Sequence, residues 1–368
     1  MMVQLNIDCE GPVTSNDNAF ELCEELIPGG GEFFARISRY DDYLADIERR
    51  PGYKAGDTLR LILPFLRAWG CTNRIMREFS EKTLLLLPGT DRMLPFVNRL
   101  MPSFIISTSY RPYLDALSVA AAFPVEHIYC TDIDMERVDM SADEAGRLKA
   151  LLDEINSFPV LEWNQAASAP GDLDVENMKI VKRLDHIFWT EIMEMESGRF
   201  VREVNPVGGK EKARAVEDSL ARTGNSLSDV FYAGDSITDV QALELVRNGG
   251  GLAMSFNGNS YAVRAASWAA VSGNTGLIGA VAHLAAMHGT SCLDDLPLDA
   301  GGRCEGKTLA EWMKGKGVDS EMTGLIMDFT QGIVPAIIPV DMDSCDTIIE
   351  ESERIRKDVR GVGIGELG

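Results

Sequence analysis

Two pairs of carboxylates each stand directly after a short apolar run of the sequence. Asp8 and Glu10 follow the first run, in the segment NIDCEGPVT (6–14), and Asp235 and Asp239 follow VFYAG (230–234). Side chains two positions apart on an extended chain point the same way, so Asp8 and Glu10 repel each other unless a cation or a turn contact offsets their charge. Carboxylate oxygens are preferred ligands of Mg²⁺, and a carboxylate can attack phosphorus as a nucleophile. These residue types therefore fit metal-assisted phosphoryl transfer.

Phosphoryl transfer also needs groups that hold the phosphate oxygens and an acid that protonates the leaving oxygen. A lysine, together with a hydroxyl group or a helix N-terminus, can do the first task. The chain supplies Ser107 and Thr108 after another apolar run, and then Lys210. Each of these residues taken singly has an ordinary explanation, as a turn residue, a helix cap or a solvated lysine. Their occurrence together, in this order and at the ends of apolar runs, favours the chemical interpretation.

Apolar runs alternate with helical patterns along much of the chain. The predicted strands comprise residues 3–8, 103–107, 125–133, 229–234, 251–258 and 267–272. This alternation is typical of an α/β fold with a doubly wound, mainly parallel sheet. Ligands bind at the carboxyl ends of the strands in such sheets, so we expect Asp8, Ser107 and Asp235 to meet at one edge.

Four segments, taken in order, resemble the four motifs of the haloacid dehalogenase (HAD) superfamily, whose members are mostly phosphatases with an aspartate nucleophile. NIDCEGPVT (6–14) resembles the first motif, hhhDxDG[TV], FIISTS (104–109) the second, GGKEKARAV (208–216) the third, and FYAGDSITD (231–239) the fourth, GDxxxD. The resemblance covers residues 1–14, 86–132 and 200–288 and implies a HAD-like Rossmannoid core for these parts of the chain.

Carried over residue by residue, the resemblance implies a magnesium site and an acid. Asp8 would be the nucleophile and a magnesium ligand. Glu10 would be the general acid and base, with its backbone carbonyl also on the metal. Asp235 would ligate Mg²⁺, and Asp239 would support the metal ligands.

The same resemblance implies the phosphate-binding groups. Ser107, or its neighbour Thr108, would bind the phosphate, and Lys210 would neutralise both the phosphate and Asp8. The chain is thus expected to be a HAD-type phosphatase or phosphotransferase that acts on a small phosphorylated metabolite, with Mg²⁺ as cofactor and an aspartyl-phosphate intermediate on Asp8.

Two positions depart from the first motif. Glu10 stands where the motif has aspartate, and Pro12 stands next to Gly11 where threonine or valine is usual. The additional methylene displaces the acid by roughly 1 Å, and a misplacement of that size can cost about a hundredfold in rate. A catalytically weakened binding or regulatory protein on the same fold is therefore the alternative hypothesis.

The segment GGRCEGKT (301–308) matches the phosphate-binding loop pattern GxxxxGK[ST]. Such a loop needs a buried strand before it and a helix after it, so that backbone amides surround the phosphates. The preceding CLDDLPLDA is acidic and contains proline, which makes a poor strand. A chance match is the preferred interpretation, and a nucleotide binder that uses Lys307 is the less favoured one.

Three further segments lie outside the motifs. Residues 15–85 show helical periodicity, for example Ala19, Leu22, Cys23 and Leu26 on one face, and their position fits a helical cap between the first and second motifs. Residues 133–199 are expected to form a helical insertion, either a second subdomain or a contact in a homo-oligomer. Residues 289–368 form a C-terminal extension that braces the core or binds a partner.

Composition excludes several classes of function. The formal net charge is −22 and Lys and Arg form no long basic stripe, which argues against nucleic acid as a partner. The seven cysteines have no CxxC spacing, so reduced thiols are expected rather than a disulfide framework or a zinc site. No apolar run reaches about 18 residues, which argues against a membrane span. We therefore expect a soluble, cytoplasmic protein.

Overall fold

The computed structural model describes residues 2–164, 167–341 and 345–365 of the chain. Its centre is one eight-stranded sheet with the strand order β3-β2-β1-β4-β5-β6-β8-β7. The strands are β1 (Gln4–Ile7), β2 (Ser103–Tyr110), β3 (Ile128–Thr131), β4 (Val230–Gly234), β5 (Leu252–Phe256), β6 (Trp268–Val271), β7 (Cys304–Glu305) and β8 (Ala336–Pro339). Strands β1 to β6 are parallel, while β8 runs antiparallel to β6 and to β7. The predicted α/β fold with a mainly parallel, doubly wound sheet is confirmed.

Strand β1 lies in the middle of the parallel part, between β2 and β4, and all its residues are buried. Its alternating side chains face two different layers. Leu5 and Ile7 join the larger hydrophobic cluster on one face. Gln4 and Asn6 point to the other face, where both donate hydrogen bonds to the Ser219 hydroxyl, at 2.9 and 2.8 Å. The polar residues of this buried strand are thus satisfied by hydrogen bonds to a neighbouring helix, as burial requires.

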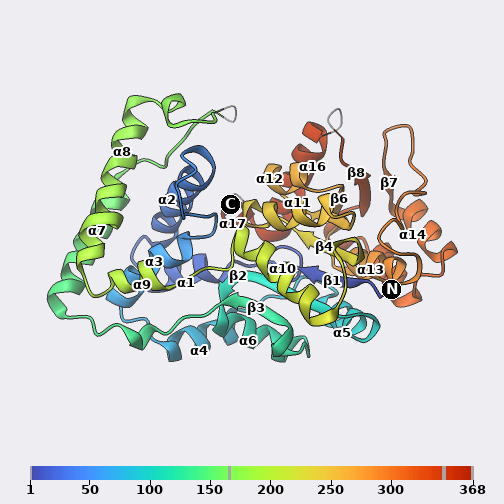
Figure 1. The fold of residues 1–368 in the computed structure, drawn as a ribbon, viewed down its shortest axis with the longest axis horizontal. Coiled ribbons are helices and arrows are strands. Elements are labelled where there is room, and N and C mark those ends of the chain that lie inside the picture. The colour runs from blue at the N-terminus through green and yellow to red at the C-terminus, as the bar shows by residue number, and fades with distance from the viewer. Residues whose placement is uncertain (1, 165–166, 342–344, 366–368) are drawn as a thin grey trace.

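Helices cover both faces of the sheet (Figure 1). One face packs against α5, α6 and α13, and the other packs against α10, α11 and α12. These helices are α5 (Thr90–Leu100), α6 (Arg111–Ala120), α10 (Lys210–Thr223), α11 (Val240–Asn248), α12 (Ser260–Ala265) and α13 (Gly276–His288). A further helix, α4 (Asn73–Thr83), lies along α6.

A second, all-helical lobe stands beside the carboxyl end of the parallel strands (Figure 1). It contains α1 (Asn18–Leu26), α2 (Gly30–Asp42), α3 (Thr58–Ala68), α7 (Ala142–Ser157), α8 (Val175–His186) and α9 (Gly198–Glu203). One hydrophobic cluster joins all six helices, with the rings of Phe33, Phe65 and Phe188 at its centre. The described residues of 133–199 therefore share one hydrophobic core with helices α1 to α3 of residues 15–85, and these parts of the two segments build a single cap.

The C-terminal part extends the sheet. Strands β7 and β8 add to the edge beyond β6, and α14 (Gly306–Gly315) and α15 (Ser320–Met327) pack on α13 and on each other. Helix α16 (Cys345–Arg360) packs against α12 and β6, and the short α17 (Val362–Gly365) follows it. The described residues of 289–365 thus pack as part of the core, and a role in binding a partner stays a prediction.

The phosphate-binding loop pattern does not have the required structure. The segment before GGRCEGKT forms no strand, and the two-residue strand β7 falls inside the pattern itself. Lys307 is exposed and forms an ion pair with Glu311 at 3.6 Å. The chance match preferred from the sequence agrees with this geometry. Among the helices of the described ranges, none is long and apolar enough to cross a membrane.

The junction of α13 and α15 contains a contact that depends on pH. The Asp319 backbone N–H donates a hydrogen bond to Nδ1 of His283 at 2.9 Å, which is possible only when that nitrogen is unprotonated. Burial lowers the pKa of His283 below its ordinary value, and the negative charge of Asp319 opposes this shift. The unfolded chain therefore binds this proton more tightly, so the contact stabilises the fold above about pH 6.5 and is lost as the pH falls.

We expect His283→Gln to flatten the acid side of the stability profile. The glutamine oxygen can still accept the hydrogen bond from Asp319, but it does not titrate. Urea unfolding at about pH 7.5 and at about pH 5.5 should show a larger loss of free energy of unfolding for the wild type than for the variant. Parallel losses in the two proteins would contradict the assignment.

Candidate active site

Three buried carboxylates meet at the carboxyl end of the sheet. Asp8 follows β1, Asp235 follows β4, and Asp239 lies in the turn that leads into α11. One ligand oxygen from each lies within 4.8 Å of the others, which is a spacing that one metal ion can bridge. Strands β1 and β4 are neighbours, yet the chain winds outward from them in opposite directions. This is the topological switch point, where ligands bind in doubly wound sheets.

Backbone contacts fix these carboxylates. The N–H of Asp8 continues the pairing of β1 with β4 by donating to the Ala233 carbonyl at 2.9 Å. Asp239 accepts hydrogen bonds at 3.1 Å from the N–H groups of both Asp235 and Ser236, which closes the turn after β4. A Cβ atom at Gly234 would lie 2.4 Å from Cγ of Asp239, so only glycine permits this turn.

Gly11 keeps space open between Asp235 and the loop after β1. Its φ of +106° lies where residues with a side chain are strained, and a Cβ atom there would meet Oδ2 of Asp235 at 2.1 Å. The cluster thus combines acidic oxygens, a close backbone approach and room that a side chain would fill. Mg²⁺, which takes oxygen ligands, fits this donor set.

Lys212 supplies the positive charge that the sequence analysis assigned to Lys210. Its Nζ lies 2.6 Å from Oδ2 of Asp8 and 2.8 Å from Oδ1 of Asp239, and its side chain is fully buried. Lys210 is instead exposed at the start of α10 and lines a separate pocket beside Lys54. The assignment of Lys210 was therefore wrong by two residues. Helical periodicity could have identified Lys212, because this residue shares the inward face of α10 with Val216 and Ser219.

The surroundings of Asp8 and Asp239 shift the pKa values of these two groups in opposite directions. Burial raises the pKa of Asp8 well above its ordinary value, and the charge of Asp239 raises it further, while Lys212 opposes both effects. Burial also acts on Asp239, but the ion pair with Lys212 and the hydrogen bond from the Tyr232 hydroxyl leave its pKa below the ordinary value. A cation bound beside Asp8 would favour its ionised form and lower its pKa.

Glu10 lies at the border between the core and the cap. Its carboxylate accepts a hydrogen bond from the N–H of Asn18 in the first turn of α1, at 2.9 Å. Burial raises the pKa of Glu10 to about 8, the charge of Asp17 adds to this, and Arg360 opposes it. A carboxyl group with such a pKa carries a proton at neutral pH, which is the state that a general acid needs.

The two hydroxyl residues after the apolar part of β2 have different surroundings. Thr108 lines the cavity above the carboxylates, and its hydroxyl donates to the Val207 carbonyl at 3.1 Å. Ser107 is buried, and its hydroxyl accepts a hydrogen bond from the Ser109 N–H at 3.1 Å. Both residues stand at the same sheet edge as Asp8, as predicted.

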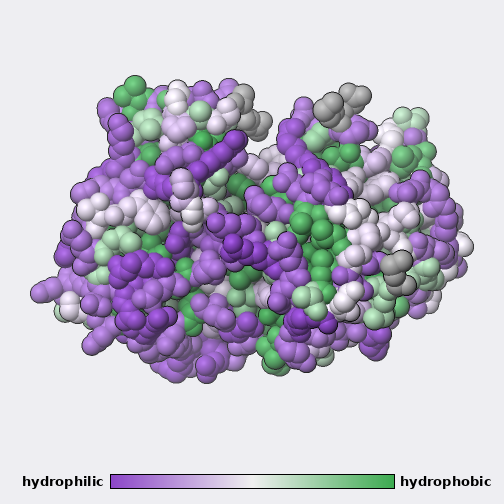
Figure 2. Space-filling view, in the orientation of Figure 1, coloured by the Kyte–Doolittle hydropathy of each residue, from purple (hydrophilic) through white to green (hydrophobic). Residues whose placement is uncertain are grey.

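The cap closes over this edge. It contributes Phe34, Ser38, Asp41 and Thr58 to a cavity of about 90 Å³ whose floor contains Asp8 and Asp235. The contact is tight: a Cβ atom at Gly208 would lie 2.3 Å from the Ala55 carbonyl oxygen. A larger cleft of about 740 Å³, lined by α2 and by parts of α16, shares Ser38 and Asp42 with the cavity. Figure 2 shows a mainly hydrophilic face that is hollowed between the cap and the C-terminal part of the core.

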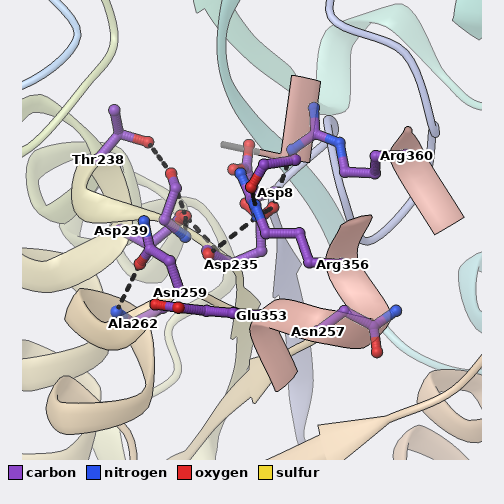
Figure 3. A network of polar contacts seen from close by, with 12 residues as sticks. Asp8, Asp235, Thr238, Asp239, Asn257, Asn259, Ala262, Glu353, Arg356 and Arg360 are labelled. Atoms are coloured by element: carbon purple, nitrogen blue, oxygen red, sulfur yellow. Dashed lines mark hydrogen bonds and ion pairs between the residues drawn. The ribbon is translucent and has the colours of Figure 1, made fainter. Parts of the chain in front are cut away.

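Two arginines that the sequence analysis did not single out reach the cluster from α16. Nη1 of Arg356 contacts Oδ2 of Asp235, and Nη1 of Arg360 lies 3.2 Å from the same oxygen (Figure 3). The two arginine side chains are 2% and 5% exposed. Residues 356 and 360 are four apart and therefore share one helical face, but the chain region that contains them lies outside the HAD-like motifs.

Comparisons with known proteins place the fold. No protein-family model matches the sequence, and no curated protein matches it. The gene product AF1437 from Archaeoglobus fulgidus is similar in structure, with a TM-score of 0.78 and 26% identity over 100% of this chain and 99% of that chain. A phosphoserine phosphatase in its apo form matches with a TM-score of 0.41 and 10% identity, over 72% of this chain and 92% of its own.

A HAD-family hydrolase, t0658 from Salmonella enterica serovar Typhi, matches with a TM-score of 0.40 and 11% identity, over 70% of this chain and 62% of its own. Because the match to the Archaeoglobus protein covers all of this chain, it includes the C-terminal part with β8 and α16 as well as the core and the cap. The whole architecture, an α/β core with a helical cap and a C-terminal bracing region, recurs in that protein.

Proposed function

We propose that this protein is a magnesium-dependent phosphohydrolase that acts on a small phosphomonoester through an aspartyl-phosphate on Asp8. The observation that carries this proposal is the buried cluster of Asp8, Asp235 and Asp239, with Lys212 between two of its members. The order of the motifs in the sequence, with the Asp–x–Glu pair after the first strand and GDSITD after the fourth, supports the same chemistry.

In this proposal, Asp8 receives the phosphoryl group and Glu10 transfers the protons. A carboxylate oxygen of Asp8 attacks phosphorus, the bond from phosphorus to the leaving oxygen breaks, and Glu10 gives its proton to that oxygen. Water then attacks the phosphorus, Glu10 takes the proton of the water, and the bond from phosphorus to Asp8 breaks. Inorganic phosphate leaves, and both carboxyl groups return to their starting states.

The other residues hold and balance charge. Lys212 keeps Oδ2 of Asp8 in place, and the Cys9 N–H donates to Oδ1 at 2.7 Å, so the carboxylate is oriented before substrate binds. Thr108 lies in the wall of the cavity, and its hydroxyl would donate to the phosphate in exchange for the Val207 carbonyl that it now contacts. Asp8, the Glu10 carbonyl and Asp235 would hold Mg²⁺, which would supply positive charge between these oxygens and the phosphate.

We expect phosphate release to require Mg²⁺. The protein, freed of metal by chelation, should release no phosphate from a panel of phosphomonoesters, and added Mg²⁺ should restore the release. Asp235 engages the arginines of α16 and the carboxylates around Asp8 repel a phosphate dianion, so we expect the substrate to need the cation to reach Asp8. Phosphate release that continues unchanged in excess chelator would contradict the proposal, and the preferred compounds would indicate what the cap recognises.

A binding or regulatory protein on the same fold is the second candidate. It is favoured by Glu10 and Pro12, which depart from the motif, and by the two arginines that already pair with Asp235. This candidate predicts that Mg²⁺ and phosphorylated compounds bind without turnover of any compound in the panel. The same experiment therefore separates the two candidates.

A further inference from the structure

The cavity above Asp8 has an unusual balance of charge for a site that receives phosphate. Six carboxyl groups line it, from Asp8, Glu10, Asp17, Asp41, Asp42 and Asp235. Among the lining residues in the described part of the chain, the cationic ones are Arg356 and Arg360. Lys212 lies below the cavity and is engaged by Asp8 and Asp239. Among the described lining residues, a phosphate dianion that enters this cavity therefore meets positive side-chain charge from α16, while Lys212 balances Asp8 and Asp239 beneath it.

The two guanidinium groups already point at the reacting end of the cavity (Figure 3). Arg356 contacts the Asp235 carboxylate, and its Nη1 lies 3.2 Å from the Asp235 carbonyl oxygen. Arg360 donates from Nε to the Ser15 carbonyl at 3.2 Å and from Nη2 to the Asn16 carbonyl at 3.4 Å. These carbonyls orient Arg360 so that its Nη1 faces Asp235, a candidate metal ligand.

Helix α16 holds these arginines as a fixed part of the fold. Ile348 and Ile349 pack in a hydrophobic cluster with residues of β6 and β8. Glu351 forms two contacts of 3.0 Å with Arg303, and Glu353 accepts a hydrogen bond from the Ser260 N–H at 3.1 Å. A helix anchored on this many elements is a component of the site, whereas a removable inhibitory segment would need to detach from all of them.

We propose that Arg356 and Arg360 are phosphate-binding residues, and that α16 thereby completes the active site. This inference rests on the proposed function. Asp235 would help to hold a divalent cation, whose charge would offset the carboxylate that the arginines now contact and would favour phosphate oxygens next to them. The planar guanidinium fork matches the geometry of phosphate oxygens better than a lysine does. The arginines then exchange Asp235 for the phosphate.

The test uses the full chain with Arg356→Gln and Arg360→Gln. The matched control is Arg354→Gln on the same helix, because this arginine is 64% exposed and forms a surface ion pair with Asp358 at 3.1 Å. Titration calorimetry first measures Mg²⁺ binding alone, and then the binding of inorganic phosphate at saturating Mg²⁺. The Michaelis constant is measured on the best compound of the panel.

We expect each arginine variant to bind Mg²⁺ at least as tightly as the wild type but to bind phosphate about tenfold more weakly, with a similar rise in KM, since each loses charge-assisted hydrogen bonds. Arg354→Gln should match the wild type. Arg356→Lys keeps a positive charge beside Asp235 but loses the planar fork, so its phosphate affinity should lie between those of the wild type and Arg356→Gln. If Arg356→Gln does not fold, Arg356→Lys and Arg360→Gln provide the test.

Equal phosphate affinity in all variants would overturn the inference while leaving the proposed function intact. So would faster turnover at limiting Mg²⁺ with unchanged KM and phosphate affinity, because the arginines would then only compete with the metal. In a third outcome, the wild type turns over no compound, yet both arginine variants bind phosphate more weakly than the wild type does. The phosphate site then stands and the proposed hydrolysis fails.

Discussion

Replacement of Asp8 by asparagine is expected to reduce phosphate release on the order of ten-thousandfold or more, by analogy with the loss of other catalytic nucleophiles. The amide has nearly the same shape as the carboxylate, but its oxygen is a poor nucleophile, so no aspartyl-phosphate can form. The expected loss is in turnover, and Mg²⁺ binding should weaken as well because one anionic ligand is gone. Mass spectrometry of protein quenched during turnover should find one added phosphoryl group on the wild type and none on Asp8→Asn.

Asp132→Asn is the matched control for this change. Asp132 also follows a parallel strand, β3, but its side chain is 79% exposed and pairs with Arg111 at 3.0 Å. The same change of charge there should leave release within experimental error of the wild type. Asp8→Asn protein that retains folding by circular dichroism and still releases phosphate would rule out Asp8 as the nucleophile.

Removal of Lys212 has the second large expected effect. Lys212→Met keeps an unbranched apolar stem but leaves Asp8 and Asp239 without their buried partner. Breaking a buried ion pair by removing one member costs about 3–5 kcal/mol, because the other charge stays buried and uncompensated. We expect a loss of this size in the free energy of unfolding from urea titrations, together with loss of phosphate release.

Lys210→Met is the control that separates the two lysines of the third motif. Its side chain is exposed at the start of α10, so the variant should stay within about 0.5 kcal/mol of the wild type in stability. It should also release phosphate at the wild-type rate. The reverse pattern, a silent Lys212→Met and an inactive Lys210→Met, would restore the assignment made from the sequence.

The sequence was sufficient for the core because local signals there agree with the global arrangement. Parallel strands place their carboxyl ends at one edge, so three residues far apart in the chain, Asp8, Ser107 and Asp235, could be expected together once their strands were recognised. The assignment of Lys210 was wrong for a local reason. The motif resemblance identifies the helix, but it does not show which residues of the helix face the strands. In the structure, the inward face of α10 begins at Lys212.

The remaining errors concern contacts between distant segments. Periodicity shows that a helix has an apolar face, but not which partner covers that face. The joining of residues 133–199 with residues 15–85 in one cluster is a contact of this kind. Arg356 and Asp235 are 121 positions apart, and no local pattern links an arginine on a C-terminal helix to a strand end.

The construction of the cap from two segments has a consequence for co-translational folding. Residues 15–85 are synthesised first, and the part of their apolar surface that residues 133–199 cover in the folded chain stays exposed until those residues have emerged, after β2 and β3. We therefore expect the cap to be completed late in synthesis, with its first half exposed to aggregation in the meantime. Slow translation between the two segments would lengthen this exposure and favour aggregation.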